Sequence, residues 1–307
     1  MELISIGMPT YNGNRYLRAT INSLLAQTYK NFELIISDDN STDRTAAICQ
    51  EFTKKDRRII FIQQKKRLGF ARNFNFVLQK AGTPYFLWAG QDDLWDKNYI
   101  KILLQLLESN PDAVSAVSNY QNLFEGKKYT VKKHNFNEQE TNNLNRTVNS
   151  LLHFIITNNL SYFYGLHKTA VLKRIGGYQI DSRPFFKSSD YLTIFRLLTQ
   201  GRMVFSHKTL FFKRETGMFT RRFTLLEKRR FTKKVRAAII RYLSLPLSFV
   251  YDALLSIRYM VFSHFSTWQK VVLIVNIAIF YLRRNFEFLL SILQGIWYLI
   301  KGIIRSL

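Results

Sequence analysis

The first 90 residues alternate between short apolar segments and longer segments with the periodicity of a helix. The apolar segments are Leu3–Met8, Phe32–Ile36, Ile59–Gln63 and Tyr85–Trp88. A helix is predicted after each of them, most clearly over Arg15–Ala26, where apolar residues recur at helical spacing. Strands that alternate with helices are typical of a doubly wound, mainly parallel sheet. The sequence therefore predicts an α/β fold whose sheet is flanked by helices.

The alternation continues further along the chain. A helix is expected over Lys97–Asn110, a strand over Ala113–Ser118 and a returning strand over Phe163–Leu166. Two more helices are expected, a short one over Thr169–Ile175 and another from Asp190 to about Gln200.

Polar residues gather where the predicted strands end. Thr10-Tyr11-Asn12 follows the first strand, Asp38 to Asp43 follows the second, and Gln91-Asp92-Asp93 follows Tyr85–Trp88. The carboxyl ends of parallel strands meet at one edge of a sheet, and open α/β sheets bind ligands at that edge. These residues are therefore expected to form one site.

Asp92 and Asp93 are adjacent carboxylates at this edge. Paired carboxylates there suit a hard divalent cation that neutralises phosphate oxygens. Taken alone, the pair is explained equally well by a solvated acidic turn.

Composition limits the remaining possibilities. The chain has 307 residues, 47% of them hydrophobic, which is enough for a core and argues against wholesale disorder. The single cysteine, Cys49, excludes an intramolecular disulfide framework and gives no metal-binding spacing. No basic segment followed by an apolar one opens the chain, so we expect no cleaved signal peptide.

The formal net charge of +24 is unevenly spread. From Arg202 onward there are about 19 Lys and Arg against about 4 Asp and Glu, roughly +15 of the total. This half of the chain is expected to face an anionic partner, which can be a nucleic acid, an anionic lipid or a phosphorylated substrate.

Five motifs in a fixed order then point to a family. They are a strand followed by Pro9-Thr10-Tyr11-Asn12, the acidic stretch Asp38–Asp43, Gly69–Asn73, Gln91–Trp95, and Ser189-Asp190. Together they resemble family 2 glycosyltransferases, which are inverting enzymes of the GT-A fold that use nucleotide-diphospho-sugars. The resemblance covers about residues 1–215. It implies a GT-A-like nucleotide-sugar transferase domain over 1–215 and a separate basic, helical region over 216–307.

The resemblance also implies roles for the motif residues. Pro9, Thr10, Tyr11 and Asn12 would line the nucleobase pocket, and Asp38 and Asp39 would accept hydrogen bonds from the base or ribose. Arg72 would hold the diphosphate with its planar guanidinium. Gln91 and Asp92 would contact the nucleotide-sugar. Asp92, helped by Asp93, would coordinate Mg²⁺ or Mn²⁺, and Asp190 would be the catalytic base.

Two positions depart from the family pattern. Gly90 occupies the place of the first Asp of the Asp-x-Asp signature, which leaves Asp92 as the main metal ligand. Mg²⁺ often uses one or two carboxylates plus phosphates and water, so a single ligand is tolerable. Ser189 stands where the family often has an acidic residue before the base.

Simpler readings of the same residues stay open. Asp38–Asp43 can be a turn with a helix cap, Arg72 can be a surface residue, and Asp190 can be an ordinary carboxylate at a helix start. His153, His167 and His207 show no ligand spacing and are expected to be structural or exposed.

The composition changes after about residue 215. A basic cluster over Arg221–Arg236 precedes three apolar stretches, Leu243–Phe265, Val271–Leu282 and Phe286–Ile304. The last has a narrow polar stripe and a wide apolar face, which suits a helix lying in a membrane interface beside anionic lipid. Alternatively, these helices pack on each other or on a second copy of the chain, or they form a hairpin that spans the bilayer.

The sequence thus predicts an inverting glycosyltransferase, peripheral on the cytoplasmic face of the cell membrane. It would move a sugar from a nucleotide-diphospho-sugar to a glycan or lipid-linked acceptor in cell-surface polysaccharide synthesis, without nucleic acid. The alternatives are a catalytically degenerate scaffold, motivated by Gly90, and a basic nucleic-acid-binding protein, motivated by the charge.

Overall fold

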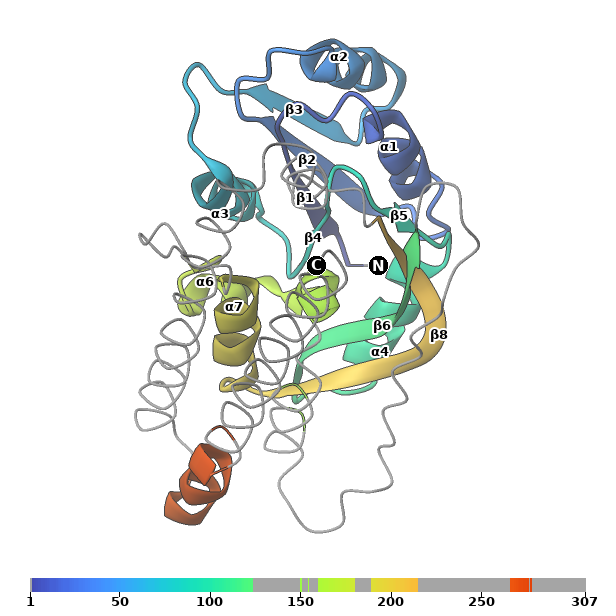
Figure 1. Ribbon diagram of the computed structural model, residues 1–307. Helices are drawn as coiled ribbons and strands as arrows, with labels where there is room; N and C mark the ends of the chain where they lie inside the picture. The colour runs from blue at the N-terminus through green and yellow to red at the C-terminus, as the bar shows by residue number, and fades with distance from the viewer. Residues whose placement is uncertain are drawn as a thin grey trace, which may run out of the picture.

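The structure is a computed structural model that describes residues 2–123, 150, 154, 160–179, 189–214, 266–275 and 277. Its strands form one large sheet with helices on both sides (Figure 1).

The elements follow the predicted alternation. The strands are β1 (Ile4–Thr10), β2 (Phe32–Asp38), β3 (Ile59–Gln63), β4 (Tyr85–Trp88), β5 (Leu94–Trp95), β6 (Ala113–Leu123), β7 (Leu166–Lys168) and β8 (Arg202–Arg214). The helices are α1 (Leu17–Leu25), α2 (Thr45–Lys55), α3 (Phe70–Lys80), α4 (Tyr99–Glu108), α6 (Thr169–Arg174) and α7 (Ser189–Leu198), with the 3₁₀ helix η2 over Leu160–Tyr164.

The sheet has two halves of different character. Its order is β3-β2-β1-β4-β7-β6-β8-β5, and the β3-β2-β1-β4 half is parallel throughout. In the other half β7 runs antiparallel to both β4 and β6, β8 is parallel to β6, and β5 is antiparallel to β8. The α/β fold with a mainly parallel sheet flanked by helices is confirmed.

Strand β1 is buried along its whole length because both faces of the sheet are covered. On one face, Ile4, Ile6 and Met8 pack with apolar residues of α1, α2 and α4. On the other face, Phe86 and Trp88 of β4 pack with residues of α3, α6 and α7. A near-continuous apolar run, rather than strict alternation, is what a parallel strand between two helical layers requires.

The sheet also buries polar side chains that pair within it. His167 of β7 is fully buried, with Nδ1 2.9 Å from the Ser115 hydroxyl and Nε2 3.1 Å from the Phe163 carbonyl oxygen. Burial lowers the pKa of His167 to about 4, which keeps the imidazole neutral.

Cys49 of α2 is fully buried as well, and burial raises the pKa of its thiol to about 12.

The expected strand over Phe163–Leu166 is wrong in its position. Phe163 and Tyr164 belong to η2, and the strand begins at Leu166. The Phe163 ring stacks on Trp88, with centroids 4.5 Å apart, and the Tyr164 carbonyl oxygen accepts a hydrogen bond from the Tyr99 hydroxyl. These long-range contacts favour the 3₁₀ turn, and no short-range pattern reveals them.

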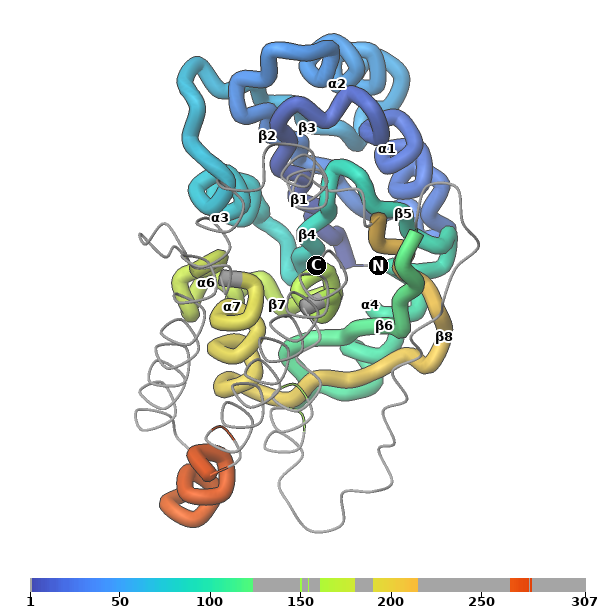
Figure 2. Tube along the Cα trace, in the orientation of Figure 1, coloured from blue at the N-terminus to red at the C-terminus, as the bar shows by residue number. Residues whose placement is uncertain are grey.

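Strands β5 and β8 were not foreseen. β8 is long and curls around its half of the sheet, so that its end lies beside β5 (Figure 2). Leu94 pairs with Phe212, and Trp95 pairs with Phe211. This pairing brings the end of β8 to the acidic turn that follows β4.

Most of the region 216–307 lies outside the described residues, as do the basic cluster and most of the three apolar stretches. Residues 267–275 are helical, and Leu273 and Ile277 are buried in the core that includes α7. Among the helices that the structure describes, none is both long and apolar enough to cross a bilayer.

Candidate active site

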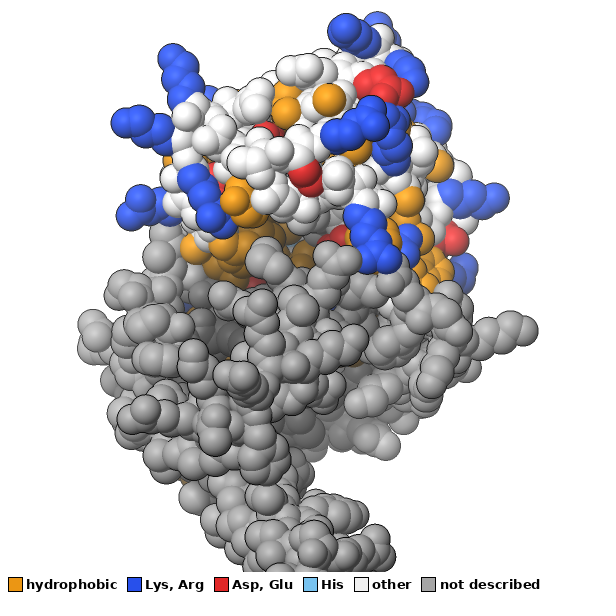
Figure 3. All heavy atoms as spheres, turned by 45° about the horizontal axis from the view of Figure 1, so that its top comes forward, with side chains coloured by type: hydrophobic (Ala, Val, Ile, Leu, Met, Phe, Trp, Pro, Cys, Tyr) orange, Lys and Arg blue, Asp and Glu red, His pale blue; other side chains and the backbone are white. Residues whose placement is uncertain are grey.

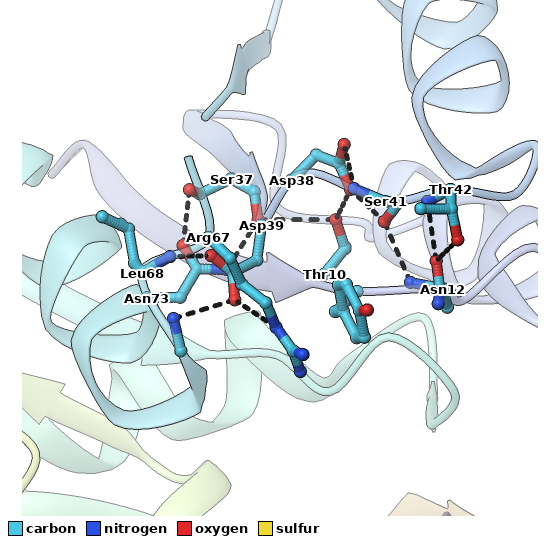
Figure 4. Close-up of polar contacts among 12 residues, drawn as sticks. Thr10, Asn12, Ser37, Asp38, Asp39, Ser41, Thr42, Arg67, Leu68 and Asn73 are labelled. Atoms are coloured by element: carbon cyan, nitrogen blue, oxygen red, sulfur yellow. Dashed lines mark hydrogen bonds and ion pairs between the residues drawn. The ribbon is translucent and has the colours of Figure 1, made fainter. Parts of the chain in front are cut away.

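The turns after β1 and β2 are held together by side chains (Figure 4). The Asn12 amide donates to the Ser41 hydroxyl at 2.9 Å, and Asn12 Oδ1 accepts from the Thr42 amide at 2.9 Å. Asn12 has a φ of +48°, a left-handed conformation that asparagine tolerates better than most residues. Asp38 is fully buried and accepts from both the amide and the hydroxyl of Ser41, with Thr10 Oγ1 3.5 Å away. Asn12 and Asp38 therefore shape this end of the site.

Asp39 organises the loop that precedes α3. Its carboxylate is almost fully buried and accepts hydrogen bonds from the amides of Leu68 at 2.5 Å and Gly69 at 3.0 Å. Arg67 Nε lies 3.7 Å from the same carboxylate. Gly69 has a φ of +87°, which a residue with a side chain rarely adopts. Asp39 thus ties the end of β2 to the start of α3 (Figure 4).

Tyr11 is fixed on two sides. Its amide donates to Gln91 Oε1 at 2.9 Å, and its carbonyl oxygen accepts from Gln91 Nε2 at 3.2 Å. The Arg67 guanidinium lies over the Tyr11 ring, 3.9 Å from its centroid. Gln91 and Arg67 therefore hold Tyr11 in a fixed position at the end of β1. Arg67 was missed in the sequence, although it ends a short basic run just before Gly69.

Pro9 and Thr10 are buried at the end of β1, in register with Ser37 and Asp38. Arg72 is exposed in the first turn of α3, three residues after the Gly69 amide that Asp39 binds. Lys and Arg side chains are spread around the edge of the face that carries α1, α2 and α3 (Figure 3).

The acidic turn after β4 contains two carboxylates in different surroundings. Asp92 is half-buried, whereas Asp93 is almost fully buried and accepts a hydrogen bond from the Arg214 amide at 2.9 Å. Burial raises the pKa of Asp92, against the opposing charges of Arg214 and Lys213. The pKa of Asp93 is also raised, first by burial and then by the neighbouring charge of Asp92.

Gly90 has a steric reason for lacking a side chain. A Cβ atom at this position would lie 2.6 Å from Asp93 Oδ2. The bond between Asp93 and the Arg214 amide holds that carboxylate in place. An aspartate at position 90, as in the Asp-x-Asp pattern, would therefore collide with the Asp93 carboxylate in its present position.

Asp190 lies in the first turn of α7, where a carboxylate is favoured by the helix dipole. It is half-buried, and its Oδ1 accepts a hydrogen bond from the Tyr178 hydroxyl at 2.8 Å. Burial raises the pKa of Asp190, while the Tyr178 hydrogen bond and the charge of Lys213 oppose that shift.

Tyr178 is itself held from α3. Asn75 Oδ1 accepts from the Tyr178 amide at 2.7 Å, and Asn75 Nδ2 donates to the Tyr178 carbonyl oxygen at 2.8 Å. The preceding Gly177 has a φ of +69°, and a Cβ there would lie 2.3 Å from Asn75 Oδ1. The residues Asn75 and Tyr178 thus fix the carboxyl group of Asp190, and the Gly176-Gly177 pair is the sequence signal that marks this turn.

The charges of three carboxylates act on the Tyr164 hydroxyl. The pKa of the Tyr164 hydroxyl is raised well above its usual range, first by burial and then by the charges of Asp93, Asp190 and Asp92. The charge of Lys213 opposes the raised pKa of each of these three carboxylates. Ring contacts support this link: the Tyr164 ring lies 5.2 Å from that of Phe211 on β8 and 5.3 Å from that of Phe163, which lies 5.4 Å from that of Tyr178. The sequence had assigned no role to Tyr164 or Lys213.

Among the described residues, no three Asp, Glu, His or Cys side chains converge as a complete metal-binding set. A divalent cation here would thus use Asp92 together with phosphate oxygens of a ligand. That donor set suits Mg²⁺, which commonly takes one or two carboxylates and completes its shell with phosphates and water.

The Gly90 geometry gives a stability prediction. Substituting Gly90→Asp should lower the free energy of unfolding by about 1–3 kcal/mol, because the new side chain forces Asp93 away from the Arg214 amide. Urea denaturation measures this change. The control is Gly82→Asp, since no atom lies within 4 Å of a Cβ at Gly82. Equal stability of the two variants would contradict the steric account of Gly90.

Relatives of known sequence match part of the chain. GlyG of Streptococcus pneumoniae, described as a glycosyltransferase, is 36% identical over 39% of this chain and 40% of its own length. WfaP of Escherichia coli is 39% identical over 39% of this chain and 47% of its own length. It is described as a UDP-Glc:α-D-GlcNAc-diphosphoundecaprenol β-1,3-glucosyltransferase. The matched segments span less than half of either relative.

The fold resembles that of S. aureus TarS. The structure of S. aureus TarS residues 1–349 in complex with UDP-GlcNAc matches with a TM-score of 0.64 and 18% sequence identity. The match covers 94% of this chain and 73% of TarS 1–349, and it supports the GT-A-like fold. A family profile described as Glycosyl transferase family 2 matches residues 5–171, more than half of the chain. The chain belongs to glycosyl transferase family 2.

Proposed function

We propose that the chain is an inverting glycosyltransferase that moves a sugar from a nucleotide-diphospho-sugar to a hydroxyl group of a glycan or lipid-linked acceptor. The observation that carries this proposal is the series of contacts that joins the acidic turn to Asp190. Asp93 accepts from the Arg214 amide at the end of β8, and Phe211 of the same strand packs on Tyr164. Phe163 contacts both Tyr164 and Tyr178, and Tyr178 donates to Asp190. Asp92 would lie on the side of the donor phosphates, and Asp190 would serve as the base. The activity described for WfaP and the family membership support a role in cell-surface polysaccharide synthesis.

The nucleoside would bind at the end of the sheet where Tyr11 lies. Gln91 and Arg67 hold this aromatic ring in place, so it can stack on a base without first losing much conformational freedom. The backbone around Asn12 and the loop shaped by Asp38 and Asp39 would complete the pocket for base and ribose. The basic side chains at the edge of this face would attract an anionic donor.

The diphosphate would lie between Asp92 and the end of β8. Asp92 would hold Mg²⁺ or Mn²⁺, and the cation would stabilise the negative charge of the departing nucleoside diphosphate. Lys213 and Arg214 would add positive charge at the same place, since both already oppose the raised pKa of Asp92. The raised pKa of this carboxyl group indicates that a nearby cation would be favourable.

Asp190 would remove the proton from the acceptor hydroxyl as its oxygen attacks the anomeric carbon. The attack comes from the face opposite the leaving diphosphate, so one displacement inverts the configuration and no covalent intermediate is needed. Burial raises the pKa of Asp190 and makes it a stronger base than a free aspartate. Tyr178 positions the carboxyl group by donating to its other oxygen.

The substitution Asp190→Asn should lower kcat for transfer by about 10²- to 10⁴-fold, because it removes the proton acceptor and keeps the shape of the side chain. Donor binding should stay nearly unchanged. Calorimetric titration with UDP-, GDP- and dTDP-sugars, chosen from a thermal-shift screen, measures binding, and product analysis measures transfer. Unchanged transfer would remove Asp190 as the base. An unsubstituted chain that binds a donor but transfers and hydrolyses none would favour the scaffold alternative.

The substitution Tyr178→Phe should shift the pH dependence of the reaction. The Tyr178 hydrogen bond lowers the pKa of Asp190, so its removal should raise that pKa further. The base is then protonated up to a higher pH, and the acidic limb of the kcat–pH profile should move to higher pH. Activity lost near the acidic limb should recover at higher pH. A uniform loss at every pH would instead indicate a structural effect.

The substitution Asp92→Ala should weaken Mg²⁺-dependent binding of the donor on the order of 10- to 100-fold, the scale seen when a metal site loses a supporting group. Titration of the same UDP-sugar with Mg²⁺ and with EDTA checks this. In EDTA the variant and the original chain should bind alike. Identical Mg²⁺ titrations for both would show that Asp92 is not a ligand.

We also propose that the protein binds peripherally to the cytoplasmic face of the membrane. On helix 267–275, Trp268, Val271 and Val275 lie on one side and are 71%, 46% and 49% exposed, while Leu273 faces the core. A tryptophan and two valines on an exposed helix face suit the apolar boundary of a bilayer. The net charge of +24 favours anionic lipid, and a lipid-linked acceptor would lie at the same surface.

Vesicle flotation tests the membrane proposal. The double variant Trp268→Ser/Val271→Ser should bind vesicles containing phosphatidylglycerol several-fold more weakly, because it loses apolar area that enters the interface. Ile60→Ser, which removes a 44% exposed apolar residue elsewhere, is the matched control. Equal flotation of both variants would contradict the assignment. Salt-dependent binding to DNA or RNA without flotation would favour the nucleic-acid alternative, and a change only in oligomeric state would favour self-association.

A further inference from the structure

Phe70 is the first residue of α3, and its side chain is 62% exposed. The next residues on the same helix face, Phe74 and Val77, are 5% and 0% exposed. The buried face of α3 therefore continues to Phe70, where the protein no longer covers it. Phe70 thus belongs to the helix face that packs on the core, although its own ring is exposed. An exposed aromatic ring on such a face is a candidate contact for a ligand, unlike a single apolar residue on the solvent face.

The ring of Phe70 is fixed relative to the proposed base. Its centroid lies 4.5 Å from that of Phe74 and 5.9 Å from that of Tyr178, which it meets edge to face. The Tyr178 hydroxyl donates to Asp190 at 2.8 Å, and Asn75, also on α3, holds the Tyr178 backbone. One tyrosine ring thus separates Phe70 from the carboxyl group that would accept the proton.

On its other side, Phe70 follows Gly69, whose amide is bound by Asp39. This bond and the left-handed backbone of Gly69 set the direction in which α3 begins. Phe70 therefore lies at the fixed start of a helix, next in the chain to the Gly69 amide that Asp39 binds and in ring contact with the Tyr178 that bonds Asp190.

The chemistry of this position fits a sugar ring. A pyranose has a face of C–H groups that packs against an aromatic ring, while its hydroxyl groups point outward around the edge. Binding sites for such ligands combine apolar or aromatic walls with a few placed polar groups. A lipid chain would need a continuous apolar surface, but the neighbouring residues Arg67 and Arg72 are exposed and charged.

We propose that Phe70 is the platform on which the acceptor's sugar ring stacks, and that this contact aims the attacking hydroxyl at Asp190. The proposal rests on the proposed transferase function. It assigns the ring to the acceptor because the base must contact the acceptor hydroxyl, and Phe70 touches the residue that positions the base. The donor diphosphate is assigned to Asp92 and Lys213.

Steady-state kinetics of the full chain test the assignment. The acceptor probe is N-acetylglucosamine α-linked through diphosphate to a short lipid, and the donor is the UDP-sugar that the chain turns over. Phe70→Ala should raise the KM for this acceptor by roughly tenfold, which corresponds to about 1.4 kcal/mol. The KM for the donor and the rate of donor hydrolysis by water should change less than twofold. Phe70→Trp should keep the acceptor KM close to the original.

The control variants separate stacking from packing. Phe70→Leu keeps an apolar side chain of similar reach but no aromatic face, so it should behave like Phe70→Ala; recovery of the acceptor KM by leucine would overturn the proposal. Ile60→Ala, another exposed apolar residue, should leave both KM values unchanged. A raised donor KM with an unchanged acceptor KM would assign the ring to the donor and overturn the proposal. Failure of the original chain to transfer or hydrolyse any donor would instead contradict the proposed function.

Discussion

The hydrogen bond from the Arg214 amide to the Asp93 carboxylate joins the two halves of the site. The parallel half of the sheet supplies the turns after β1 and β2 and the acidic turn after β4. The mixed half carries the basic residues at the end of β8, which lie near the acidic turn because β8 pairs with β5. The bond to Asp93 and the pairing of Leu94 with Phe212 together fix the end of β8 beside the acidic turn. Because a buried carboxylate is costly unless its hydrogen bonds are satisfied, this contact also keeps the turn in a single conformation.

A second set of contacts supports the base from a helix on the other side. Asn75 of α3 holds the backbone of Tyr178, and Tyr178 holds Asp190 of α7. The same helix begins where Asp39 binds the Gly69 amide. Helix α3 therefore connects the region that would hold the nucleoside with the region that would accept the proton. Catalytic groups that are fixed before the substrate arrives lose less entropy in the reaction, which is the physical benefit of this arrangement.

The sequence was sufficient for what depends on local pattern. Apolar runs and helical spacing predicted β1 to β4 and the helices between them, because a parallel strand covered on both faces must be apolar along its length. The motif residues Tyr11, Asp39 and Asp92 were found at the strand ends, where the geometry of such sheets places them. The roles assigned to them by resemblance remain predictions.

What the sequence did not reveal depends on contacts between distant residues. Phe163 and Tyr164 are in a 3₁₀ turn because Trp88 and Tyr99 pack against them. Arg67 reaches Tyr11 across a loop, Tyr178 reaches Asp190 after a glycine turn, and Lys213 arrives from the end of the sheet. Gly90 looked like the loss of a ligand, whereas the structure shows an additional steric reason in the position of Asp93. Most of these contacts join residues that are far apart in the sequence, so they become visible only once the fold is known.

The burial of Cys49 has a practical consequence for work on this protein. It is the chain's single cysteine, it is fully buried in α2, and the raised pKa of its thiol leaves almost no thiolate at neutral pH. The native protein should therefore be inert to maleimides, and the rate of Cys49 labelling reports how often the α2 side of the sheet opens. A cysteine introduced on an exposed surface would react alone, so a single spectroscopic probe can be attached without first removing the natural one.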